Sequence, residues 1–175
     1  MKKRILSAVI AIFVIVCLSV SALAEEETPT EYNNMVSLLM EGETGTVLQH
    51  NGGYEKVAQG TLNKLMTVLL TAEEIESGGL SINDVVTVSS NANAQTGAVV
   101  WLMPGEEITI EELLKSVIIG NANDASVALA EIVGGNEEEF TGMMNARAFE
   151  LGMRNTVFKN PAGYDCAGQY STPYD

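Results

Sequence analysis

The spacing of apolar positions along the chain changes several times, and each spacing predicts a different element. Short β-favouring runs at residues 35–40 and 46–49 are separated by the Gly-rich sequence 41–45. This arrangement predicts two antiparallel strands joined by a tight connection. From Thr61 the apolar positions recur at three- and four-residue steps until the Ser-Gly-Gly sequence at 77–79. That pattern predicts a helix between these two points.

The middle of the chain carries shorter signals. A β-branched run at residues 85–88 is followed by a small, polar loop over 91–97 and a turn over 101–106 that contains Pro-Gly. Thr109 then precedes an apolar helical pattern, with Glu112 three residues later. This pair is a capping box, which predicts the start of a helix.

Two more helices are predicted towards the C-terminal end. One runs from residue 123 or 124 to 133, where Gly-Gly ends it. Asn136 with Glu139 predicts the N-terminal cap of the next helix, which runs to Leu151. Residues 156–163 predict an extended segment followed by a turn.

The first 24 residues have the composition of an export signal. Residues 2–4 are basic, residues 5–20 are apolar, and Ala-Leu-Ala at 22–24 is a cleavage site of the A-x-A type. A retained transmembrane anchor is the alternative, because the apolar run approaches the ~20 residues that span a bilayer. The small-residue site and the three glutamates after it favour cleavage, which leaves no stable membrane anchor.

After cleavage, residues 25–32 predict an acidic, disordered leader, and residues 33–175 are enough for about one domain. The chain has 23 acidic and nine basic residues and a net charge of −14, and three of the basic residues lie in the signal. This balance argues against nucleic acid or an anionic membrane surface as a partner.

Histidine and cysteine are too scarce for several kinds of site. Cys166 is the only cysteine beyond the signal, so the sequence predicts neither an internal disulfide nor a thiol-rich metal site. His50 is the only histidine, which excludes a histidine-cluster metal site. A Ser-His-Asp triad would need His50, which lies beside the Asn-Gly-Gly sequence at 51–53 and is more simply explained as a turn residue.

Candidate chemistry begins with Thr61 and Lys64, whose spacing places both side chains on one helix face. A desolvated lysine can lose its proton and act as general base toward a neighbouring hydroxyl. Alone, the pair also fits an N-cap and a solvated lysine. Asn121 and Asn123 lie at a tight turn that enters a small-residue helix, where buried amides could fix a lysine or bind a peptide carbonyl. Helix capping is the alternative for these two.

Five stretches in order resemble the serine-type D-alanyl-D-alanine carboxypeptidases, the low-molecular-mass penicillin-binding proteins of peptidase family S11. The resemblance is specific because order and spacing agree over nearly all of the chain after the signal. A β-lactamase is a weaker alternative, since that related fold does not share the long match over the last stretch. The five stretches are residues 43–48, 61–67, 104–105, 121–131 and 140–163.

The resemblance implies an α+β protein with the β-lactamase/penicillin-binding (transpeptidase-like) fold. We expect this chain to carry its N-terminal strands and a nearly complete helical subdomain at residues 108–151, with the C-terminal sheet strands missing. The third family motif, K-T-G on a strand, is absent. We therefore expect an unpaired edge on the two N-terminal strands and an under-covered helix after Thr61.

The implied reaction removes the terminal D-alanine of peptidoglycan pentapeptides through an acyl-enzyme, with β-lactams as further ligands and without a metal or organic cofactor. The resemblance places Thr61 at the nucleophile position and Lys64 at the general base. Asn121 falls at the second-motif serine position and Asn123 at the second-motif asparagine. Because two serines are replaced and a motif is absent, we expect little or no activity. The alternatives are a non-catalytic peptidoglycan- or partner-binding envelope protein and a piece of a longer enzyme.

Overall fold

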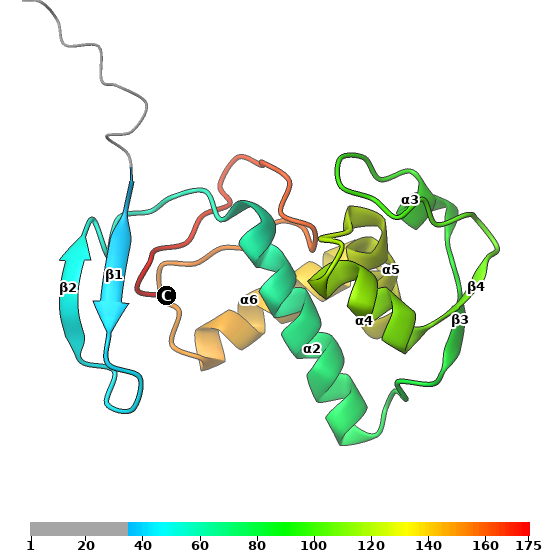
Figure 1. The fold of residues 1–175 in the computed structure, drawn as a ribbon, viewed down its shortest axis with the longest axis horizontal. Coiled ribbons are helices and arrows are strands. Elements are labelled where there is room, and N and C mark those ends of the chain that lie inside the picture. The colour runs from blue at the N-terminus through cyan, green and yellow to red at the C-terminus, as the bar shows by residue number, and fades with distance from the viewer. Residues whose placement is uncertain (1–34) are drawn as a thin grey trace, which may run out of the picture. The chain divides into compact units, whose positions relative to one another are not determined.

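The computed structural model describes residues 35–175 (Figure 1), so the predicted signal and acidic leader lie outside the described residues. Strands and helices follow one another along the chain rather than alternating as β-α-β units. In order, the elements are β1 (Ser37–Met40), β2 (Val47–Asn51), η2 (Gly60–Leu62), α2 (Asn63–Ser77), β3 (Val85–Thr87), α3 (Ser90–Asn93), β4 (Glu107–Thr109), α4 (Ile110–Ile118), α5 (Asn123–Gly134) and α6 (Glu137–Glu150).

The predicted N-terminal strand pair is confirmed. β1 and β2 are antiparallel, with Leu38 opposite His50, so His50 is a strand residue and not a turn residue. The connection is closed by the Glu41 carboxylate, which accepts the backbone N–H groups of Glu43 and Thr44 at 2.9 and 2.7 Å. This local capture of two donors explains why the Gly-rich sequence makes a tight turn.

Two short elements in the middle of the chain differ from the prediction. Residues 91–97 were predicted as a loop, but the short helix α3 includes residues 91–93. Ser89 is the N-cap of this helix, and its hydroxyl accepts the N–H of Ala92. β4 was not predicted, and it pairs with β3 to form a second two-stranded antiparallel sheet. A strand or helix of three or four residues is too short to show a period in the sequence.

The longer helices and their ends are confirmed. Thr109 and Glu112 form the complete capping box of α4, with hydrogen bonds in both directions. Asn136 caps α6 by accepting the N–H of Glu139 at 2.9 Å. Gly78 ends α2 with φ at 82°, the left-handed conformation that glycine adopts without steric cost. The predicted helix start at Thr61 is a 3₁₀ turn, η2, which continues directly into α2.

Helix α5 is at the centre of the packing. It contacts α2, α3, α4 and α6, and its first eight residues are all buried. Such burial on every side requires small side chains, and Ala125, Ala128 and Ala130 meet that requirement. One apolar cluster joins α5 to α4 and the β3–β4 sheet, and a second joins it to α2 and α6 through Phe140 and Met144.

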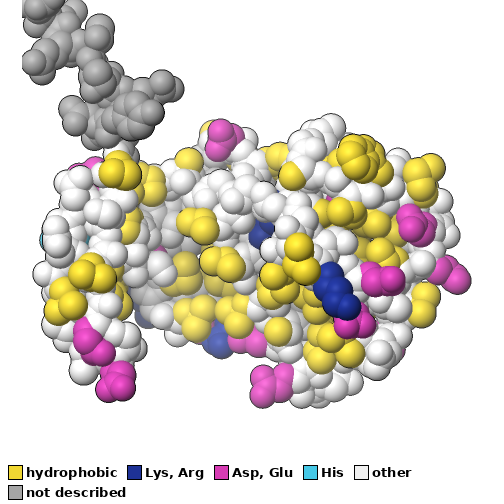
Figure 2. All heavy atoms as spheres, in the orientation of Figure 1, with side chains coloured by type: hydrophobic (Ala, Val, Ile, Leu, Met, Phe, Trp, Pro, Cys, Tyr) yellow, Lys and Arg dark blue, Asp and Glu magenta, His cyan; other side chains and the backbone are white. Residues whose placement is uncertain are grey.

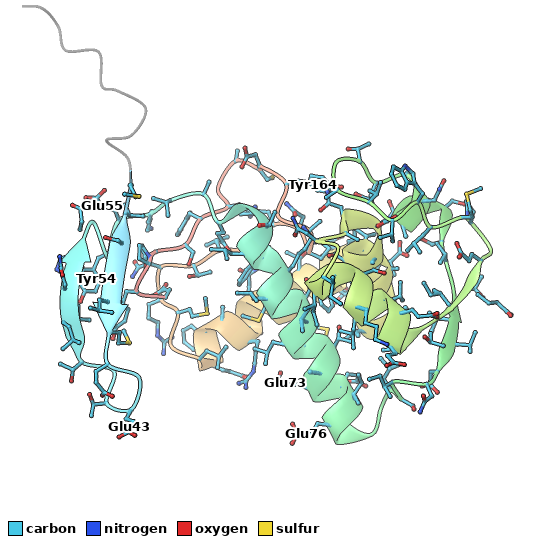
Figure 3. All side chains as sticks on the ribbon, viewed as in Figure 1. Glu43, Tyr54, Glu55, Glu73, Glu76 and Tyr164 are labelled. Carbon is cyan, nitrogen blue, oxygen red and sulfur yellow. The ribbon has the colours of Figure 1, made fainter. Side chains whose placement is uncertain are left out.

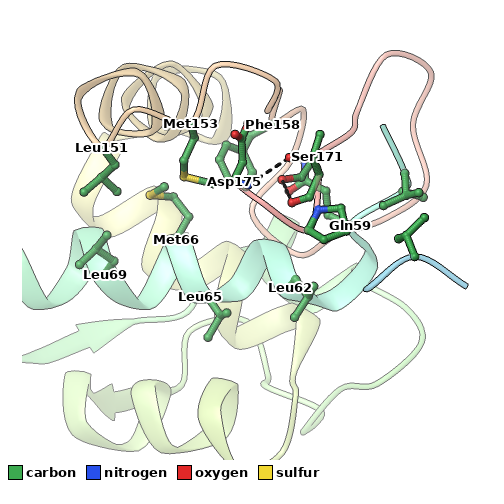
Figure 4. Close-up of a pocket in the computed structure, with 15 residues that line it drawn as sticks. Gln59, Leu62, Leu65, Met66, Leu69, Leu151, Met153, Phe158, Ser171 and Asp175 are labelled. Carbon is green, nitrogen blue, oxygen red and sulfur yellow. Dashed lines mark hydrogen bonds between the residues drawn. The ribbon is translucent and has the colours of Figure 1, made fainter. Parts of the chain in front are cut away.

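The face of α2 that carries Leu65 is poorly covered, as expected. Leu62 and Leu65 are 65% and 69% exposed, and both line an apolar cavity of about 530 Å³. Its walls come from α2, from Leu151 and Met153 after α6, and from the chain's last residues (Figure 4). Figure 2 shows apolar side chains gathered over α2 and the segments beside it. Among the described residues, none of the helices combines the length and the apolar content needed to cross a bilayer.

Candidate active site

Three of the four candidate residues line one small cavity beside the start of α2. Thr61 is exposed in the 3₁₀ turn, Lys64 lies in the first turn of α2, and Asn121 lies just before α5. The cavity has a volume of about 280 Å³, and its remaining walls are apolar. Its lining residues are Thr61, Leu62, Lys64, Leu65, Val68, Val117, Ile118 and Asn121.

Lys64 is buried, with only 4% of the residue exposed. Its Nζ donates to the carbonyl of Ala162 at 2.7 Å. Burial lowers the pKa of Lys64, because a charged amine loses solvation in an apolar surrounding. None of the ion pairs among the described residues involves Lys64. The simpler interpretation of this residue as a solvated lysine is therefore wrong, and a desolvated amine lies in the same cavity as the Thr61 side chain.

The chain after α6 lies along the buried side of α2, where three side chains donate to three successive carbonyls. This arrangement was not predicted, because the partners are more than 90 residues apart in sequence. It fixes the residues 160–162 against the start of α2. The pairs are Asn63 Nδ2 with Asn160 O (3.0 Å), Thr67 Oγ1 with Pro161 O (2.9 Å) and Lys64 Nζ with Ala162 O (2.7 Å).

Gly163 packs against the backbone next to the candidate nucleophile. Its φ is +88°, and a Cβ there would overlap the carbonyl of Gly60 and lie 3.1 Å from the backbone N of Thr61. Only a glycine permits both the left-handed backbone and the close contact. The predicted turn at the end of 156–163 therefore holds the backbone around Thr61 in place.

Asn121 and Asn123 do not act as helix caps, so that alternative is wrong. The N-cap of α5 is Ala122, and no side chain caps it. Asn121 is exposed with φ at +53°, in the left-handed region that asparagine tolerates better than most residues. Asn123 is buried and its Nδ2 donates to the carbonyl of Thr96 at 2.6 Å. It thus bonds to the backbone of its own chain, and it is not among the residues that line the cavity with Lys64.

Two further residues hold the loop that Asn123 binds, and neither was singled out from the sequence. The Tyr164 hydroxyl donates to the same Thr96 carbonyl at 3.0 Å (Figure 3). Asp124 is 1% exposed, and its carboxylate accepts the backbone N–H groups of Val100 and Leu102 at 3.1 Å each. Their partners lie 22 to 68 residues away in the sequence, which leaves no local signal.

His50 lies away from this cavity. It is exposed in β2, and its ring makes an edge contact with Tyr54, with the ring centroids 5.3 Å apart. Neither cavity described above includes His50 among its lining residues. The structure therefore offers no support for a triad that uses this histidine.

Residues 23–175, which include the cavity and the turn that braces it, match the family described as D-alanyl-D-alanine carboxypeptidase. The chain belongs to the D-alanyl-D-alanine carboxypeptidase family. The resemblance predicted from the sequence is thus confirmed.

The relatives give the extent of the match. The chain is 38% identical to the D-alanyl-D-alanine carboxypeptidase DacF of Bacillus subtilis over 99% of this chain and 46% of the relative. It is 36% identical to DacC of Escherichia coli over 79% of this chain and 36% of the relative. The chain therefore spans less than half the length of these curated relatives.

Solved structures of the family confirm the transpeptidase-like fold. The D-alanyl-D-alanine carboxypeptidase DacD of Francisella tularensis superposes with a TM-score of 0.78 at 32% identity, over 83% of this chain and 35% of that one. Penicillin-binding protein 5 of Haemophilus influenzae gives 0.78 at 29% identity, over 84% and 44%. The predicted α+β class is correct, and the second sheet, β3–β4, adds to the strands that were expected.

Proposed function

We propose that this chain carries the acylation corner of a D-alanyl-D-alanine carboxypeptidase that acts on peptidoglycan stem peptides. The observation that supports this most strongly is the buried Lys64 amine in the cavity that Thr61 also lines. The relatives are named for release of D-alanine from a D-alanyl-D-alanine end, and the solved relative from Haemophilus influenzae is a penicillin-binding protein. We propose that the substrates of this chain are peptides ending in D-Ala-D-Ala and that β-lactams are further ligands.

The proposed chemistry uses two side chains. The neutral Lys64 amine takes the proton from Thr61 Oγ1 as this oxygen attacks the carbonyl of the penultimate D-alanine. The amide bond then breaks, the proton passes to the leaving nitrogen, and free D-alanine departs. Water hydrolyses the threonyl ester by the reverse proton path. A lysine with a lowered pKa suits this role, because a larger fraction is neutral near pH 7.

The side chains at positions 61 and 121 lead us to expect weak turnover. The threonine methyl at position 61 stiffens χ1 and crowds attack on a carbonyl. Asn121 has no hydroxyl to pass a proton, and positioned acid–base groups contribute about 10²- to 10⁴-fold. It lines the cavity and can contact Lys64 or a substrate carbonyl only through its amide. Asn123 acts on the neighbouring loop through Thr96.

Labelling with a fluorescent penicillin, followed by peptide mapping, tests the proposal. We expect faint label at Thr61, stronger label in Thr61→Ser, and none in Lys64→Gln. Lys115→Gln is the matched control, because Lys115 is exposed and forms an ion pair with Glu111 on its own helix. D-alanine release from a peptide ending in D-Ala-D-Ala should follow the same order. Absence of label in both the parent and Thr61→Ser would exclude the catalytic proposal.

The second candidate is a non-catalytic envelope protein that binds peptidoglycan peptides. The replacement of both family serines by Thr61 and Asn121 favours it. Retention on purified peptidoglycan without release of D-alanine, unchanged by Lys64→Gln, would support this candidate over the enzyme. Both proposals require export, which the basic and apolar pattern of residues 1–24 supports. An exported protein whose N-terminus is Glu25 would establish signal cleavage.

A further inference from the structure

The Asn160 side chain closes the turn that follows Pro161. Its Oδ1 accepts the backbone N–H groups of Gly163 and Tyr164 at 2.6 and 2.9 Å. Its Nδ2 donates to the carbonyl of Tyr164 at 2.9 Å and to Oε1 of Gln169 at 3.2 Å. Every donor and acceptor function of this amide is thus used within residues 160–169, and Asn160 is the side chain that bonds both N–H groups after Ala162.

The other side of this turn faces the candidate site. The Ala162 carbonyl, inside the turn, accepts the hydrogen bond of Lys64 Nζ, and the Gly163 backbone packs on the peptide between Gly60 and Thr61. Ala162 itself is buried, so the turn also excludes water from the lysine. Movement of this turn would therefore affect the amine and the backbone of the candidate nucleophile together.

We propose that Asn160 is a positioning residue for the candidate site, acting through the Ala162 carbonyl on Lys64 and through Gly163 on Thr61. A neutral amine has two N–H bonds and one lone pair. When one N–H is held by the Ala162 carbonyl, rotation of the amine is restricted and the lone pair is confined to the remaining directions. The inference rests on the proposed role of Lys64, but its test measures the amine directly and needs no turnover.

Few ionisable groups surround Lys64, so a change in its pKa can be interpreted directly. Among the side chains that line its cavity, Lys64 alone is ionisable. The turn residues 160–163 carry no ionisable side chain. On α5, the Asp124 carboxylate is bound to the N–H groups of Val100 and Leu102. The pKa of Lys64 is lowered by burial alone, so it should report directly on how closely the turn covers the amine.

The experiment is a pH titration of the full chain labelled with ¹³Cε-lysine, followed by NMR, with Lys64→Met used to assign the Lys64 signal. In the parent, the pKa of Lys64 should lie below that of the exposed lysines. In Asn160→Ala the turn loses its closure, water reaches the amine, and the pKa of Lys64 should rise toward the exposed lysines.

Asn145→Ala is the matched control. Asn145 also holds the chain after α6 through a side-chain amide, because it donates to the carbonyl of Phe158 and accepts its N–H at 2.9 Å each. The hydrogen bonds of the Asn145 side chain in the described part of the chain go to Thr141 and Phe158 and not to residues 160–163. Asn145→Ala should therefore destabilise the same segment but leave the pKa of Lys64 unchanged. Equal rises in the two variants would mean general loosening and would overturn the positioning role.

Asn160→Ser covers the case in which Asn160→Ala does not fold. Its hydroxyl can accept from an N–H group within the turn, so we expect a smaller rise of the same sign. An unchanged pKa of Lys64 in a folded Asn160 variant would refute the proposal. A clear rise in a protein that neither releases D-alanine nor takes penicillin label would support the positioning role while rejecting the proposed reaction.

Discussion

The two sides of helix α2 differ in how completely they are packed. On one side, Met66 and Leu70 are buried in the cluster that α6 completes with Phe140 and Met144. On the other side, Leu62 and Leu65 are mostly exposed, and they line the larger cavity together with Met66. The buried face of this helix thus contributes to the free energy of unfolding through apolar packing, and its exposed face contributes little. The candidate cavity lies at the boundary, since Lys64 is buried while Leu65 beside it is exposed.

The largest effect should come from the fully packed interior around α5, in the apolar cluster that joins α5 to α4 and the β3–β4 sheet. Leu129 of α5 is fully buried in the cluster with Leu113 and Val127, so Leu129→Ala should lower the free energy of unfolding by about 2–5 kcal/mol. Urea denaturation followed by circular dichroism measures this loss. A cost below 1 kcal/mol would mean that the packing around α5 is loose.

Lys64→Met should act at the boundary and in the opposite direction. The pKa of Lys64 is lowered in the folded chain, so between its folded and unfolded pKa the unfolded chain binds more protons. Stability from this group therefore falls as pH decreases from the unfolded pKa towards the folded pKa, and it changes no further below the folded pKa. Methionine removes the cost of burying the charge and should raise the melting temperature most at low pH within that window. Melting temperatures at several pH values check the prediction, with Lys115→Met as the exposed control.

Thr109→Ala should cost about 1 kcal/mol, because the capping box of α4 loses the hydroxyl that accepts the N–H of Glu112. The comparison variant is Thr44→Ala in the exposed β1–β2 connection, where the backbone N–H groups remain bonded to Glu41. Thermal melts of both should show the larger loss at Thr109. Equal losses would mean that the capping hydroxyl of α4 contributes no more than a hydroxyl in an exposed turn.

The smallest effect on stability should come from the exposed side. Leu65→Gln should change the free energy of unfolding by less than about 0.5 kcal/mol, since the residue is 69% exposed. It should still weaken the binding of an apolar dye such as ANS, which senses exposed apolar surface. A destabilisation similar to that of Leu129→Ala would show that the outer face is covered in solution.

Local signals explain which parts of the fold could be predicted. The caps at Thr109 and Asn136 and the glycine after α2 act within four residues, so the helices were recoverable from the sequence. β4 and α3 were not, because elements of three or four residues leave no measurable period. Their presence depends on pairing with β3 and packing on α5.

The candidate site divides in the same way. The relation of Thr61 to Lys64 follows from helical spacing, and the structure adds that the amine is buried. The acceptor for that amine is the carbonyl of Ala162, 98 residues away in the sequence. No sequence pattern predicts this hydrogen bond. Asn123 was recognised as a buried amide, but its partner Thr96 follows only from the path of the loop.

The burial of α5 on all sides has a consequence for how substitutions should be distributed. An amphipathic helix confines its constraint to about one face, so a random library would recover many residues at its other positions. In α5 the positions 123–130 are consecutive and all enclosed, and larger side chains at Ala125 or Ala130 would overpack the interior. Tolerance in such a library should therefore fall to a continuous minimum over residues 123–130, without the three- to four-residue rhythm of the neighbouring helices.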